Sequence, residues 1–219
     1  MKEYEYVTKK EYSPVRKEIE EEILKKVHKF LKKKYGITFQ HKLIGSGRRH
    51  LITRLVGGNT GFDFDYNLIL ENVEEEYSPK EFKEKFIEAF NEAIKGTYYN
   101  NAENSTSAIT IKVVDRINKR IVHSCDFAIT SYLDCDSPEK GYDYIRNLKN
   151  GIYQWVYRDF SKNSDAKLND ILDYWSDGWE AIKEEYLKLK CKQDKHSLAL
   201  YFESINNVYN WMLQDKRNR

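Results

Sequence analysis

The chain has little cysteine, no long apolar run and almost no excess of either charge. Its three cysteines, Cys125, Cys135 and Cys191, are odd in number and follow no disulfide spacing, so we expect reduced thiols. Charged residues interrupt the segment after Met1 where a secretory signal would need apolar residues, and no run is long enough to cross a bilayer. These features argue against a disulfide scaffold or a membrane protein and predict a cytoplasmic protein.

The charges nearly cancel, because 37 basic residues face 35 acidic ones for a net charge of +2. Such a balance gives no strong signal for nucleic-acid binding, since that function needs a basic surface. Hydrophobic residues make up 40% of the chain, and its 17 tyrosines supply much of the apolar area. The core is therefore lean and aromatic, but 219 residues can bury enough surface to fold.

Hydrophobic periodicity and capping residues predict an α+β fold. The expected elements are a helix over 14–35 that Ser13 caps and Gly36 ends, a strand over 37–44, a short basic helix over 47–55, a strand over 62–70, a capped helix over 79–95 and a hairpin of strands over 108–114 and 121–129. From about Ser137 the strand signal disappears. We therefore expect a catalytic domain over 1–136, with a mixed β-sheet and flanking helices, followed by a helical domain over 137–219.

Two carboxylates lie two residues apart on the strand over 62–70. Because side chains alternate along a strand, Asp63 and Asp65 share one face, while Phe62, Phe64 and Tyr66 share the other. The aromatic face is suited to burial. Adjacent carboxylates repel each other unless a cation lies between them, and a hard divalent ion accepts oxygen ligands of this kind.

A third carboxylate, Asp126, interrupts a strand that is otherwise suited to burial. A lone charge there is costly unless it is paired or metal-bound. If the strand lies beside the one over 62–70, three carboxylates converge and can share two Mg²⁺ ions. The Gly45-Ser46 turn offers backbone N–H groups and a hydroxyl to an anion. Phosphate chemistry with a divalent metal is the resulting hypothesis.

Together, the Gly45-Ser46 turn, the Asp63-x-Asp65 strand and the later Asp126 resemble the nucleotidyltransferase superfamily of DNA polymerase β. The small bacterial enzymes and the oligoadenylate and cyclic-dinucleotide synthases are the most similar in layout. The resemblance implies that the three aspartates are catalytic and ligate two Mg²⁺ ions. It also implies that Gly45, Ser46 and Arg49 bind a nucleoside triphosphate, with ATP expected. A nucleoside monophosphate would pass from it to a hydroxyl acceptor, either a small molecule or another nucleotide, with release of pyrophosphate.

The chain departs from the family pattern at two places. The interval from Ser46 to Asp63 is longer than usual, and His50 stands where a glycine usually follows the arginine. Neither departure removes a metal ligand. Both affect the expected binding of the triphosphate.

Other functions remain open from sequence alone. One is a non-catalytic nucleotide-binding protein on the same fold, and others are a phosphohydrolase or a toxin-like transferase that acts on protein or RNA.

Asp134 and Asp136 also form an Asp-x-Asp pair, but they lie in an expected loop where Asp136 caps a helix. His123 and Cys125 point away from Asp126 and lack zinc spacing, so we interpret them as core residues.

Overall fold

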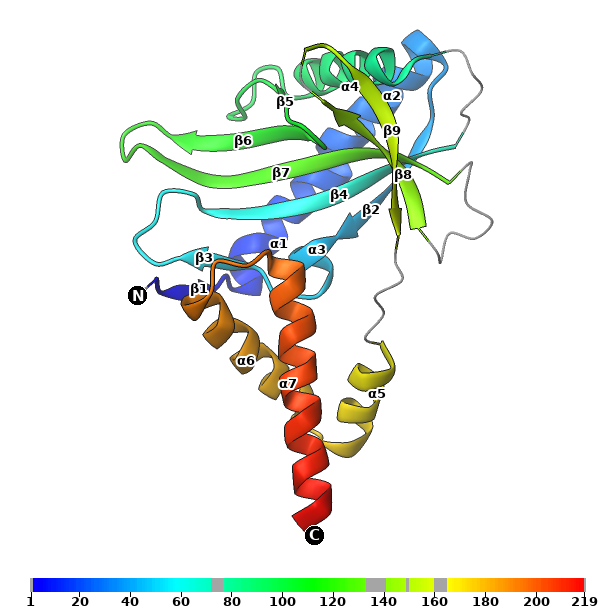
Figure 1. Ribbon diagram of the computed structural model, residues 1–219. Helices are drawn as coiled ribbons and strands as arrows, with labels where there is room; N and C mark the ends of the chain where they lie inside the picture. Colours follow the sequence, from blue (N-terminus) through cyan, green and yellow to red (C-terminus); the bar gives the residue numbers. More distant parts are fainter. Residues whose placement is uncertain (1, 72–76, 133–140, 149, 160–164, 219) are drawn as a thin grey trace. The chain divides into compact units, whose positions relative to one another are not determined.

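The computed structural model describes residues 2–71, 77–132, 141–148, 150–159 and 165–218 (Figure 1). The described residues divide into two compact units. The sheet unit comprises residues 7–52 and 58–160, and the helical unit comprises residues 1–6, 53–57 and 161–219.

The sheet unit is built on a mixed β-sheet. Its main strands are, in spatial order, β2 (Phe39–Ile44), β4 (Phe62–Leu70), β7 (Arg120–Ser131), β6 (Ile109–Asp115) and β5 (Glu103–Asn104). Strands β4 and β7 are parallel, whereas the pairs β2–β4, β7–β6 and β6–β5 are antiparallel. The predicted hairpin is therefore confirmed as β6 and β7, and the α+β fold class is confirmed by the sheet with its flanking helices.

The first helical segment begins earlier than the sequence predicts. The helices of this unit are α1 (Lys9–Glu18), the π-helical segment η1 (Ile19–Ile23), α2 (Leu24–Tyr35), the short α3 (Gly45–Arg48) and α4 (Pro79–Ala93). Thr8 caps α1 through a reciprocal capping box with Glu11, so Pro14 lies inside the helix. The box satisfies two backbone N–H groups, which explains why the start moves ahead of Ser13. The segment ends at Gly36 as predicted.

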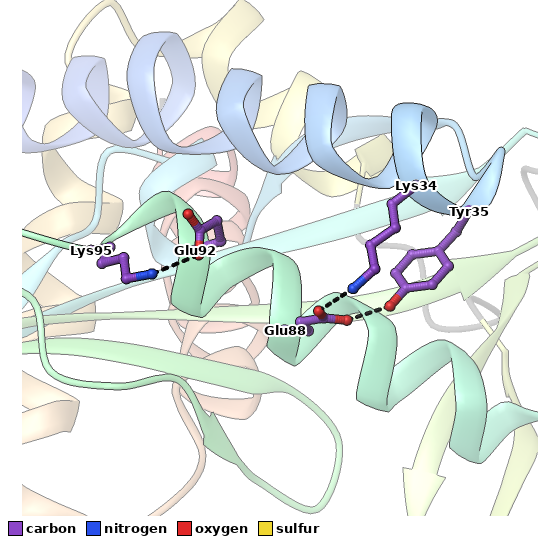
Figure 2. A network of polar contacts seen from close by, with 5 residues as sticks. All are labelled: Lys34, Tyr35, Glu88, Glu92 and Lys95. Atoms are coloured by element: carbon purple, nitrogen blue, oxygen red, sulfur yellow. Dashed lines mark hydrogen bonds and ion pairs between the residues drawn. The ribbon is translucent and has the colours of Figure 1, made fainter.

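Helices α2 and α4 pack together beside the sheet (Figure 1). Phe90 of α4 lies 4.5 Å, centroid to centroid, from Phe127 of β7, which anchors the helix on the aromatic face of the sheet. At the surface, Glu88 of α4 accepts hydrogen bonds from Lys34 and Tyr35 of α2 (Figure 2). The helices therefore occupy the aromatic face and leave the opposite face of β4 and β7 to other groups.

A second hairpin lies where the sequence predicts helix. Its strands are β8 (Gly141–Asn147) and β9 (Tyr153–Asp159), and β8 also pairs with β7 at Thr130 and Ser131. The prediction of continuous helix after Ser137 is wrong here. Tyrosine and tryptophan favour strands, and pairing with the end of β7 satisfies the backbone of β8. The predicted domain boundary between residues 136 and 137, like the Asp134–Asp136 pair, lies outside the described residues.

The helical unit contains α5 (Asp165–Tyr174), α6 (Gly178–Lys192), α7 (Ser197–Asn218) and a short antiparallel pair of β1 (Tyr4–Tyr6) with β3 (Thr53–Leu55). Helix α7 packs against α5 and α6. The predicted basic helix over 47–55 is wrong beyond Arg48, because residues 53–55 pair with β1. Among the described residues, no helix combines the length and the apolar character that crossing a bilayer requires.

Candidate functional site

The three aspartates of the sequence hypothesis lie on neighbouring parallel strands. Asp65 of β4 is the register partner of Asp126 of β7, and Asp63 is the partner of Ser124. Partners in parallel strands point to the same face of a sheet, so the three carboxylates share one face. The alternate residues Phe62 and Phe64 are buried on the other face. The two strands are therefore adjacent, which is the condition on which the sequence hypothesis depends.

The carboxylates repel one another at this face. Burial, the largest cause, and the negative charges of Asp63 and Asp126 together raise the pKa of Asp65 to about 7. The positive charge of Arg158 acts to lower this pKa but does not cancel the rise. Burial also raises the pKa of Asp126, and the hydrogen bond from Thr110 partly offsets this effect. The site therefore holds negative charge that its own cations do not neutralise.

This donor set fits a hard divalent cation. Carboxylate oxygens are the ligands that Mg²⁺ prefers, and a bound cation would relieve the repulsion between Asp63, Asp65 and Asp126. Within the part of the chain that the structure describes, no three His, Cys, Asp or Glu side chains are already gathered closely enough to hold a metal ion. The fit therefore rests on donor chemistry and charge, and a cation would draw the carboxylates together.

The Gly45-Ser46 turn lies directly against this carboxylate face. Ile44, the last residue of β2, pairs with Asp65, so the chain leaves the sheet beside that carboxylate. Gly45 has a φ of 61°, and a Cβ at this position would collide with Oδ2 of Asp65. Only glycine meets both requirements without strain. The backbone of the turn thus lies directly against the Asp65 carboxylate.

Arg49 contacts the backbone of the turn. Its Nη1 donates a hydrogen bond of 3.1 Å to the carbonyl of Gly45, and Ser46 accepts a backbone hydrogen bond from Leu51. Ser46 and Arg49 are both partly exposed. The turn is therefore braced by hydrogen bonds among its own residues.

The structure adds residues that sequence reasoning missed. Arg158 of β9 is close enough to lower the pKa of Asp65, and its guanidinium lies over the rings of Tyr142 and Tyr144 of β8. Tyr142 accepts a hydrogen bond of 3.3 Å from Arg158 Nη1. The tyrosines two residues apart were a signal for a strand, but the expectation of helix hid this cluster.

Asn67 extends the row of Asp63 and Asp65 along β4. Its side chain is 2% exposed, and its Oδ1 has no hydrogen-bond partner in the described structure.

His123 and Cys125 lie on the opposite face and are buried, as predicted for core residues. His123 pairs with Tyr99 at 3.0 Å, and burial lowers its pKa to about 4. These two residues therefore contribute to packing.

The sequence matches no protein-family model and no curated protein. The structure resembles the Vibrio cholerae cyclic AMP-GMP synthase DncV. With a linear intermediate bound, DncV gives a TM-score of 0.55 at 12% identity over 79% of this chain and 45% of DncV. The GTP-bound form gives 0.56 at 12% over 93% and 52%, and the 3′-deoxy ATP-bound form gives 0.55 at 13% over 93% and 53%.

The chain spans about half the length of these DncV chains. At such low identity, the likeness establishes a shared fold. The resemblance to the nucleotidyltransferases is therefore confirmed for the fold.

Proposed function

We propose that this protein is a metal-dependent nucleotidyltransferase that moves a nucleoside monophosphate from a nucleoside triphosphate to a hydroxyl acceptor. The observation that carries the proposal is the placement of Asp63, Asp65 and Asp126 on one face of β4 and β7, directly beside the Gly45-Ser46 turn. The nucleotidyltransferase fold supports the same reading.

The three aspartates would hold two Mg²⁺ ions, which supply charge neutralisation of the triphosphate and acidify the acceptor hydroxyl. Oδ1 of Asp126 already accepts a hydrogen bond from Thr110, so Oδ2 is the oxygen that would take the hydroxyl proton. The acceptor oxygen then bonds to the α-phosphorus, and the bond from that phosphorus to the bridging oxygen breaks. Pyrophosphate leaves, and no side chain becomes covalently attached to the nucleotide.

The triphosphate would be bound by the turn and its basic neighbours. The backbone N–H groups of Gly45 and Ser46 and the Ser46 hydroxyl would hold the outer phosphates. Arg49 would contribute positive charge from the turn, and Arg158 would contribute it from β9, where the two tyrosine rings already hold its guanidinium. ATP is the expected donor.

A nucleotide is the acceptor that the comparisons favour. DncV has been solved with GTP bound and with a linear intermediate, which contains two joined nucleotides. A nucleotide also suits a chain whose net charge is only +2, because a long RNA would require a basic surface.

The test is to incubate the protein with Mg²⁺ and each labelled nucleoside triphosphate. We expect release of pyrophosphate and a product that carries the labelled nucleotide. Orthophosphate would instead indicate a hydrolase, and binding without turnover would indicate a non-catalytic protein. A protein or RNA acceptor would appear as labelled macromolecule only when that acceptor is added.

Asp126→Asn is the matched control for this assay. The amide keeps the shape of the side chain but removes its charge, so we expect loss of turnover with the fold intact. Circular dichroism and thermal unfolding would verify the fold. Turnover at the wild-type rate in Asp126→Asn would contradict the proposed mechanism.

A further inference from the structure

Asp126 is held from the neighbouring strand by a threonine hydroxyl. Thr110 of β6 is the register partner of Asp126, and its Oγ1 donates a hydrogen bond of 2.5 Å to Oδ1. Oγ1 of Thr110 and Oγ of Ser105 lie 2.8 Å apart. Because a hydroxyl has only one hydrogen, Thr110 must accept from Ser105 while it donates to Asp126. The three side chains form a relay with a fixed direction.

Ser105 connects this relay to a buried lysine of α4. Nζ of Lys83 donates a hydrogen bond of 3.2 Å to the backbone carbonyl of Ser105. The N–H of Ser105 in turn donates to the carbonyl of Ala108, which closes the loop ahead of β6. One residue therefore contacts the lysine through its carbonyl and Thr110 through its hydroxyl.

Lys83 is an unusual lysine, because its side chain is only 1% exposed. An ammonium group in the interior costs free energy unless opposite charge or hydrogen bonds compensate it. Burial lowers the pKa of Lys83 to about 8, and the negative charge of Asp126 acts in the opposite direction. Lys80, on the same helix, is exposed and pairs with Glu84 at 3.8 Å. The charge of Lys83 is thus coupled to the carboxylate face.

We propose that Lys83, acting through Ser105 and Thr110, is a positioning residue that fixes the orientation of the Asp126 carboxylate. The relay holds Oδ1 and leaves Oδ2 for the cation and the acceptor hydroxyl. Lys83 itself does not reach the substrate. This inference rests on the proposed function, since it assigns the relay to the carboxylate that the transfer reaction uses.

The first part of the test measures Mn²⁺ binding by electron paramagnetic resonance, which does not depend on activity. Loss of a neighbouring positive charge would by itself strengthen Mn²⁺ binding, whereas loss of positioning weakens it. Weaker binding in Lys83→Met therefore reports positioning. We expect Lys83→Met and Thr110→Val to lose roughly 10- to 100-fold in Mn²⁺ affinity or in kcat, as is usual for groups that orient metal ligands.

Two control variants keep the test specific. Thr110→Ser retains the hydroxyl and should bind Mn²⁺ as the wild type does. Lys80→Met makes the same chemical change on an exposed position of the same helix and should have no effect. The double variant Lys83→Met/Thr110→Val should be no worse than Thr110→Val alone, because the lysine acts through the threonine.

The second part measures pyrophosphate release with the same variants. We expect kcat to fall while KM for the triphosphate stays unchanged, since the relay orients a catalytic group and does not bind substrate. Wild-type Mn²⁺ affinity and kcat in both Lys83→Met and Thr110→Val would overturn the inference, even if the protein releases pyrophosphate. Relay-dependent Mn²⁺ binding without pyrophosphate release would instead overturn the proposed function and leave the relay standing. A wild-type protein that binds no Mn²⁺ would overturn both.

Discussion

At the scale of single residues, Asp65 is subject to burial and to two neighbouring negative charges, all of which disfavour its ionised form. Its pKa rises to about 7 in the folded protein, from an ordinary value of 3.8. Because the folded pKa exceeds the unfolded one, ionisation of Asp65 destabilises the metal-free fold. This penalty is present above pH 7, declines as the pH falls from 7 towards 4, and is absent below that range.

Asp65→Asn should therefore stabilise the metal-free protein at pH 8, because asparagine cannot ionise. We expect the free energy of unfolding in EDTA to rise by about 2 kcal/mol, after allowance for solvent screening, and the gain to vanish at pH 4. Denaturant unfolding at both pH values measures this. Asp173→Asn, an exposed position on α5, is the control and should change little. An equal effect of Asp65→Asn at the two pH values would contradict the electrostatic explanation.

At the scale of elements, the turn by which β2 passes directly into α3 at Gly45 links the sheet to the site. Its geometry depends on the absence of a side chain at Gly45, where the Asp65 carboxylate takes the space that a Cβ would fill. Gly57 has a similar φ of 66° but has no atom within 4 Å of a Cβ built on it. The two glycines therefore separate the cost of backbone conformation from the cost of contact.

Gly45→Ala should destabilise the protein more than Gly57→Ala does. Both variants carry the left-handed penalty of about 1–2 kcal/mol, but only Gly45→Ala also displaces a carboxylate. Denaturant unfolding of the two variants gives the difference. In an Asp65→Ala background the two costs should converge, and a difference that persists there would show that the contact with Asp65 is not its cause.

At the scale of the whole molecule, the proposed function predicts stabilisation by ligand. Binding of Mg²⁺ with a non-hydrolysable triphosphate to the folded state alone adds about 2.7 kcal/mol at 100 times Kd. For a chain of this size that corresponds to a rise in Tm of roughly 5–10 °C. Ser46→Ala should reduce this rise by weakening triphosphate binding, while its ligand-free Tm stays near that of the wild type.

Hydrogen exchange would locate the stabilisation. We expect slower exchange over residues 45–48 and 62–66, where the turn and the first two aspartates lie, in the presence of Mg²⁺ and the triphosphate. Protection confined to the helical unit would contradict the proposed site. An equal rise in Tm for Ser46→Ala would count against the role of the turn.

The sequence by itself determined the strand-and-turn segments that carry the site. Alternation over 62–70 placed Asp63 and Asp65 opposite the aromatic core. The predicted cap ahead of residue 79 fixed the start of α4, where Ser78 forms a capping box with Glu81. Both features are local properties of the backbone. The fold class also followed, since the order of elements and the burial of one face leave few arrangements.

Only the tertiary structure decided which distant residues act on those aspartates. Strand β8 (141–147) formed because the end of β7 offered it a partner, β9 (153–159) pairs with β8, and this hairpin brought Arg158 near Asp65. Lys83 likewise met the Ser105 relay through the packing of α4. Such contacts join positions far apart in the chain, and local preferences carry no information about them because the pairing energy comes from the partner.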